Sequence, residues 1–170
     1  IGDQFSGGRV HAKGVGASVG TDLAGMTGGG LSIPISLVYT YTHATFRTAL
    51  GSFGPWGENV ARGDRLPNLP RHVLTVNAGL AGNGWKLDVS GNYNSAAYGS
   101  IGAAAKADPF NRIASRVIFD LAGEIAVGEN AALFGSVENL TDKTYNVGTL
   151  PSGWRPGLPR TFMAGFRFGF

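Results

Sequence analysis

Arginine is the residue type whose chemistry and spacing in this sequence suggest a binding site. Six arginines lie in or beside three long segments that interrupt the regular patterns of the chain: Arg62, Arg65, Arg71, Arg112, Arg155 and Arg160. A guanidinium group stays charged at every working pH and offers a planar fork of donors that suits carboxylate or catecholate oxygens. We therefore expect capture of an anionic ligand, with these ligand-binding candidates: Arg62, Arg65, Arg112 and Arg155.

Two structural roles stay open for the same arginines. They could form ion pairs with acids in the same segments, namely Glu58, Asp64 and Asp108. Arg71 and Arg160 each stand just before a regular strand pattern, so they could anchor a segment to the start of a strand.

Catalytic and metal chemistry find little support in the sequence. The three histidines (His11, His43 and His72) lack metal-ligand spacing, and the chain has no cysteine. Serine is plentiful, but no nucleophile motif accompanies it. We predict no enzyme, no catalytic residues, no metal site and no resident cofactor.

The composition excludes several classes of protein. Of the 170 residues, 43% are hydrophobic, 15% are charged and 28 are glycine. No apolar run approaches the roughly 18 residues of a membrane helix, and the net charge of +3 is scattered without a basic run, so nucleic-acid binding is not expected. The opening residues do not resemble a signal peptide, and the sequence suggests a fragment.

Apolar residues alternate with polar ones over seven stretches, which predicts seven β-strands. The sharpest example runs from Trp85 to Asn94, where Trp85, Leu87 and Val89 alternate with lysine, aspartate and serine. The expected strands cover residues 10–23, 31–42, 72–81, 85–94, 115–127, 131–140 and 160–170. Pro34 predicts a bulge or loose pairing near the start of the second strand, and a slip in the pattern near Gly14 predicts a bulge in the first.

The segments between these strands alternate in length. Short connections are expected at about 24–30, 81–84 and 128–130, and long ones at about 48–70, 98–114 and 143–159. Short turns at one end and long loops at the other are typical of an outer-membrane β-barrel. A soluble β-sandwich remains the alternative, although its strands would usually be shorter.

The seven expected strands are an odd number, which does not close an outer-membrane barrel. Seven antiparallel strands leave two open edges whose unpaired backbone groups cannot be satisfied in lipid. We therefore expect further strands to close the barrel, N-terminal to this chain. Charged residues on the polar face would point into the lumen (Lys86, Asp88, Arg116, Asp120, Glu124, Glu138 and Arg167), and apolar residues would face lipid (Leu87, Val89, Phe119, Leu121 and Phe166).

Three motifs then resemble one family. The segment Val137-Glu138-Asn139-Leu140-Thr141-Asp142-Lys143-Thr144-Tyr145 resembles the "ENL-D--Y" segment near the end of TonB-dependent outer-membrane receptors. The segment Arg155-Pro156-Gly157-Leu158-Pro159-Arg160 resembles the "RPG-PR" motif before their last strand. A third segment, Leu66-Pro67-Asn68-Leu69-Pro70-Arg71-His72, is similar to the ferric-citrate and siderophore branch.

The resemblance implies an all-β fold: a transmembrane antiparallel β-barrel, of which this chain supplies the last seven of about 22 strands around a plug. Residues 1–170 would be the C-terminal portion of the barrel, with the plug domain and the earlier strands outside this chain. The implied partners are the remaining strands and plug, the inner-membrane protein TonB reached through the plug, the barrel-assembly machinery, and lipid with lipopolysaccharide. Phe166, Phe168 and Phe170 would form the assembly signal.

The function implied by the resemblance is energy-coupled uptake of a ferric siderophore or ferric citrate across the bacterial outer membrane, with iron present only as part of the transported chelate. Trp56, Trp154 and Tyr145 could supply stacking surface for a ligand or belong to an aromatic girdle at the membrane boundary. The alternative functions are a non-specific outer-membrane pore or structural barrel, and a soluble β-sandwich that binds a ligand.

Overall fold

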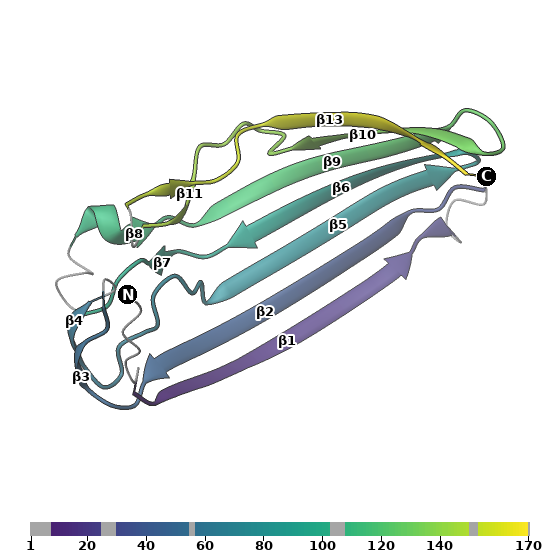
Figure 1. Ribbon diagram of the computed structural model, residues 1–170. Helices are drawn as coiled ribbons and strands as arrows, with labels where there is room; N and C mark the ends of the chain where they lie inside the picture. The colour runs from purple at the N-terminus through teal and green to yellow at the C-terminus, as the bar shows by residue number, and fades with distance from the viewer. Residues whose placement is uncertain (1–7, 25–29, 55–56, 103–107, 150–152, 170) are drawn as a thin grey trace.

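Seven long strands form one antiparallel sheet, as the alternation of residue types predicts (Figure 1). The computed structural model describes residues 8–24, 30–54, 57–102, 108–149 and 153–169. The order across the sheet is β1-β2-β5-β6-β9-β10-β13. Their bounds are β1 Val10–Asp22, β2 Pro34–Phe46, β5 His72–Gly82, β6 Trp85–Asn94, β9 Arg116–Ala126, β10 Ala131–Glu138 and β13 Thr161–Phe168.

The long loops gather at one end of the sheet and the short turns at the other (Figure 1). The loops are partly ordered by pairs of short strands: β3 (Leu50–Ser52) with β4 (Glu58–Val60), β7 (Ala97–Tyr98) with β8 (Arg112–Ile113), and β11 (Asn146–Gly148) with β12 (Arg155–Pro156). A 3-10 turn, η1 (Pro109–Asn111), precedes β8. In the described part of the chain, no helix has the length and hydropathy needed to cross a membrane.

A small apolar core lies among the loops rather than within the sheet. Phe46, Val60 and Ile101 are each at least 95% buried and pack with Leu50 and Phe53. The sheet itself is a single layer, so its large apolar side chains stay exposed in this chain. The fold therefore depends on contacts that a single sheet does not supply.

The two faces of the sheet differ in chemistry because side chains alternate along each strand. The register places the predicted lipid-facing residues on one side, which we call the apolar face: Leu87, Val89, Phe119, Leu121 and Phe166. The seven charged residues predicted to point into the lumen lie on the opposite side, which we call the polar face. There Glu124 pairs with Arg167 at 2.7 Å and with Lys86 at 3.9 Å.

Two details of the strand prediction are wrong. β2 begins at Pro34 and pairs in unbroken register with β1, so neither Pro34 nor Gly14 causes a bulge. Proline is accommodated because it is the first residue of its strand. The apparent slip near Gly14 reflects a change of residue type on the apolar face, from valine to lysine and histidine. Glycine is needed at position 14 because a Cβ there would lie 2.4 Å from the carbonyl oxygen of Tyr41.

Candidate functional site

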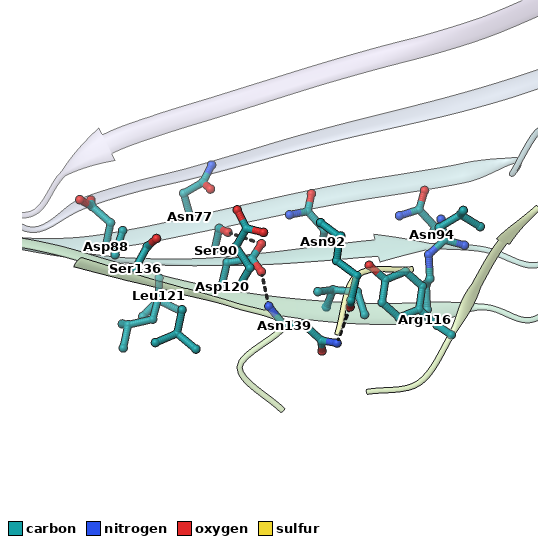
Figure 2. A pocket seen from close by; sticks show the side chains of 18 residues that line it. Asn77, Asp88, Ser90, Asn92, Asn94, Arg116, Asp120, Leu121, Ser136 and Asn139 are labelled. Atoms are coloured by element: carbon teal, nitrogen blue, oxygen red, sulfur yellow. Dashed lines mark hydrogen bonds between the residues drawn. The ribbon is translucent and has the colours of Figure 1, made fainter. Parts of the chain in front are cut away.

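The polar face contains a hollow of about 740 Å³ near the loop end of β6, β9 and β10 (Figure 2). Its lining mixes polar residues, including Asp88, Asn92, Arg116, Asp120 and Glu138, with aliphatic ones such as Ile118 and Val147. Figure 2 shows Asp88, Ser90, Asn92 and Asn94 spaced along one strand, because every second residue of β6 points to this side. Because Asp88, Arg116, Asp120 and Glu138 are ionisable, this surface suits contact with water or with a protein segment, and not with lipid.

Asp120 connects two strands and a loop within this hollow. Its Oδ1 accepts a hydrogen bond from the backbone N–H of Asn139 at 2.8 Å, and its Oδ2 accepts one from the hydroxyl of Ser90 at 3.4 Å (Figure 2). The carboxylate therefore helps to fix the end of β10 against β9 and β6. Its role here is structural.

Asn139 organises the loop that follows β10. Its side chain is 2% exposed, and its backbone adopts the left-handed region with φ of 51°. The amide Nδ2 donates to the carbonyl oxygens of Lys143 (2.9 Å) and Leu158 (3.0 Å), and Oδ1 accepts from the N–H of Lys143 (2.9 Å). One side chain thus joins the segment after β10 to the segment before β13.

The other residues of the two C-terminal motifs complete this junction. Arg160 pairs with Asp142 at 3.2 Å, so Arg160 has the anchoring role that its position suggested. The guanidinium of Arg116 lies 5.4 Å from the ring centroid of Tyr145. A Cβ at Gly157 would come within 2.0 Å of the Tyr145 ring, so only glycine fits there. We call these contacts, together with those of Asn139, the β10–β13 junction.

The four predicted ligand-binding arginines all lie at the loop end. Arg62 is exposed between β4 and β5, Arg112 is exposed on β8, and Arg155 is exposed on β12 beside Gly148. Arg65 is half-buried, and its Nη2 donates to the carbonyl oxygen of Leu69 at 3.4 Å. Within the described residues, none of the four forms an ion pair with a carboxylate.

The acids considered as partners have other contacts. Asp108 Oδ1 accepts from the N–H of Phe110, and Asp64 Oδ2 accepts from the N–H of Ala61. Arg65 instead lies near a second cation, since burial and the charge of Arg71 lower the pKa of Arg65. Arg71 Nε is itself buried without a hydrogen-bond partner. In the described part of the chain, no ion pair joins Glu58, Asp64 or Asp108 to any of the four arginines.

Comparison with known proteins now identifies the architecture. Residues 3–140 match the family model described as "TonB dependent receptor-like, beta-barrel". The chain belongs to this family. Among curated proteins, none matches the sequence.

Solved receptor structures share the fold of this TonB-dependent receptor barrel segment. The siderophore receptor PiuA from Acinetobacter baumannii is 19% identical with a TM-score of 0.65, over 92% of this chain and 22% of its own. The ferric citrate transporter FecA is 20% identical (TM-score 0.69; 93% and 24%), and the copper transporter OprC is 18% identical (TM-score 0.63; 95% and 24%). The chain thus spans about a quarter of the length of these receptors.

Family membership confirms several expectations. The sheet is part of a TonB-dependent receptor barrel in the bacterial outer membrane, which excludes the soluble β-sandwich. The family consists of transporters, so the prediction that the chain is not an enzyme is confirmed. The apolar face is the side that meets lipid, and the polar face is the side of the lumen.

Some features of this receptor barrel segment were not found from the sequence. The ring centroids of the exposed Phe110 and Trp154 lie 5.7 Å apart, and Trp154 Nε1 donates to the carbonyl oxygen of Phe110 at 2.7 Å. No periodicity marks Phe110, because it lies in a loop. Of the predicted assembly signal, Phe166 and Phe168 are exposed on the apolar face of β13, while Phe170 lies outside the described residues, as does Trp56.

Proposed function

We propose that this chain forms part of a receptor that takes up an anionic ferric chelate, a siderophore or ferric citrate, through energy-coupled transport. The observation that carries the proposal is the set of arginines at the loop end that no described carboxylate neutralises. Two of the structurally similar proteins are described as a siderophore receptor and a ferric citrate transporter. The chelate would bind at the long loops, through Arg62, Arg65, Arg112 and Arg155.

The polar hollow supports a second part of the proposal. In a barrel completed by further strands, Asp88, Asp120 and Glu138 would face a plug domain that fills the lumen. Movement of the plug, driven from the inner membrane through TonB, would then release the chelate. The barrel-assembly machinery would recognise Phe166, Phe168 and Phe170, and the iron would be cargo rather than a resident cofactor.

A non-specific pore is the alternative from a different functional class. A pore needs no affinity at its loops, whereas a receptor concentrates binding groups there. Arg112 and Arg155 come from different loops, and both loops are joined by the contact of Trp154 with Phe110. A shared loop surface with unneutralised cations favours the receptor.

The test replaces Arg62, Arg65, Arg112 and Arg155 by alanine, singly and together, in the complete receptor. Because a charge-assisted hydrogen bond contributes about 1.5 to 3 kcal/mol, each effective contact should weaken chelate binding roughly 10- to 150-fold. Binding of ferric citrate and of catecholate and hydroxamate ferric siderophores would be measured by fluorescence quenching. Arg167→Ala, which removes a cation at the turn end, is the control and should bind normally.

Unchanged chelate affinity in the fourfold variant, with the barrel still assembled, would refute the assignment of these arginines. A wild-type receptor that binds none of the chelates would refute the proposed substrate class.

A further inference from the structure

The three long loops pack against one another instead of projecting separately. We name them by their order along the chain: the first loop (47–71) follows β2, the middle loop (95–115) follows β6, and the last loop (139–160) follows β10. At the loop end of Figure 1, the short strands β7 and β8 of the middle loop lie between the β3–β4 pair and β11. The middle loop is therefore placed to contact both of the others.

The middle loop meets the first loop through buried apolar side chains. Ile101 of the middle loop packs with Phe46 and Val60, and all three are buried. The backbone N–H of Asn68 in the first loop also donates to the carbonyl oxygen of Tyr98 at 2.8 Å. Because packed interiors fill space closely, shortening Ile101 would leave a cavity between the two loops.

The middle loop meets the last loop through a buried polar contact. Asn111 and Thr149 are both buried, and the Thr149 hydroxyl donates to Asn111 Oδ1 at 3.5 Å. A Cβ at Gly99 would collide with Thr149 Oγ1, so the absence of a side chain at Gly99 lets the two loops approach this closely. A larger side chain at position 149 would therefore force these loops apart.

Two of the predicted ligand-binding arginines stand beside the contact between the middle and last loops. Arg112 directly follows the buried Asn111 in the middle loop. Arg155 directly follows Trp154 in the last loop, and Trp154 Nε1 donates to the carbonyl oxygen of Phe110 in the middle loop. The backbone that carries each arginine is thus held by a contact between loops.

The other two arginines stand beside the contact between the first and middle loops. Arg62 lies shortly after the buried Val60, and Arg65 precedes Leu66, which packs against the cluster around Ile101. All four arginines are therefore attached to the contacts that join the loops, although they come from three separate segments.

We propose that the middle loop joins the three long loops into one preassembled body, which fixes the four arginines relative to one another before an anion binds. Ile101 and Thr149 are then positioning residues, which act through the arginines. Such preassembly avoids the cost of ordering three loops on binding. The part that concerns the arginines rests on the proposed function, whereas the single loop body does not.

Hydrogen exchange followed by mass spectrometry, on the complete receptor in detergent without a chelate, tests whether the loops open together. Ile101→Ala breaks the contact with the first loop and should speed exchange about tenfold in β11, across the middle loop. Thr149→Leu breaks the contact with the last loop and should speed exchange in β4 in the same way. The conservative variants Ile101→Val and Thr149→Ser should exchange like the wild type. Gly51→Ala is a further control, because its Cβ would meet no atom within 4 Å.

Chelate binding tests whether the loop body positions the arginines. Thr149→Leu should weaken binding of ferric citrate or a ferric siderophore about tenfold, because the unchanged arginines lose their fixed arrangement. Combined with Arg112→Ala, it should cost less affinity than the two single losses together, because both act on the same contact. Heat-modifiable migration on a gel would confirm that each variant assembles.

Faster exchange confined to the loops that the substituted residue contacts would overturn the single loop body. Fully additive losses, or unchanged chelate affinity in Thr149→Leu while Arg112→Ala weakens binding, would overturn the positioning role. A wild type that binds none of the chelates would refute the proposed function, and the exchange measurement would still decide whether the loops form one body.

Discussion

At the scale of single residues, Asn139 shows how a family motif can be structural. The sequence marks it only as part of "ENL-D--Y" and, formally, of a glycosylation sequon. In the structure, its amide satisfies two carbonyl groups and one N–H from two different segments. No sequence pattern predicts those partners, because Leu158 is distant along the chain. The sequence does offer one indication: an asparagine at the end of a strand favours a turn there, because asparagine tolerates the left-handed conformation.

Replacing Asn139 tests this role. Asn139→Ala should lower the free energy of unfolding by about 2 to 4 kcal/mol, because buried backbone groups lose their partners. Urea unfolding of the assembled receptor in detergent would measure it. Asn130→Ala, an exposed asparagine in a short turn, should change stability by less than about 0.5 kcal/mol. Equal effects of the two substitutions would contradict the role assigned to Asn139.

Asp22 makes a pH-dependent contact at the opposite end of the sheet, beyond the last valine of β1. The hydroxyl of Ser32 donates to its carboxylate, as do the N–H groups of Ile33 and Ala24, and these bonds lower the pKa of Asp22. Because the folded pKa is below the unfolded one, the stabilisation is present above the unfolded pKa. It is lost as pH falls through the folded pKa.

The stability difference between the wild type and Asp22→Asn should therefore be largest near neutral pH and shrink as pH falls below about 4. Thermal unfolding in detergent at several pH values would measure it. A difference that grows on acidification would contradict the assigned direction.

At the scale of elements, the period-2 pattern predicted all seven long strands and the face of the seven charged residues assigned to the lumen. This succeeded because one face meets lipid and the other water, so residue type follows orientation along the whole strand. The short strands β3, β4, β7, β8, β11 and β12 could not be predicted. They have two or three residues each, too few for a period, and tertiary contacts around Phe46 and Val60 hold the β3–β4 pair.

The assignment of the two faces is tested by a matched pair on β9. Phe119→Arg puts a charge on the apolar face and should cost roughly 2 to 4 kcal/mol near the bilayer midplane. Ala122→Arg puts the same charge on the exposed polar face and should cost far less, because the lumen can solvate it. Unfolding of both variants in lipid vesicles would compare them, and the reverse order would mean that the faces are inverted.

At the scale of the whole molecule, the seven strands are one wall of a larger receptor barrel. β1 starts at the loop end and β13 finishes at the turn end (Figure 1), as an odd number of antiparallel strands requires. Along the strands towards the loop end, the apolar face comes first, then the aromatic residues at its edge, and then the loop arginines. This is the order expected on going from the membrane to the outside of the cell. The lengths of the loops predicted this order. The cations on the lipid side of β1 and β2 were not predicted, because only the strand register shows that they share a face.

The central claim is that this wall stands in the outer membrane with its long loops outside the cell. These 170 residues contain no cysteine, so single cysteines introduced here can report on position once any cysteine elsewhere in the complete receptor is replaced by serine. In intact cells that produce the complete receptor, a membrane-impermeant maleimide should label Ala61→Cys and Thr144→Cys in the long loops. It should label Asn83→Cys and Glu129→Cys in the short turns only after the outer membrane is permeabilised. Labelling of the turn cysteines, but not the loop cysteines, in intact cells would contradict the claim.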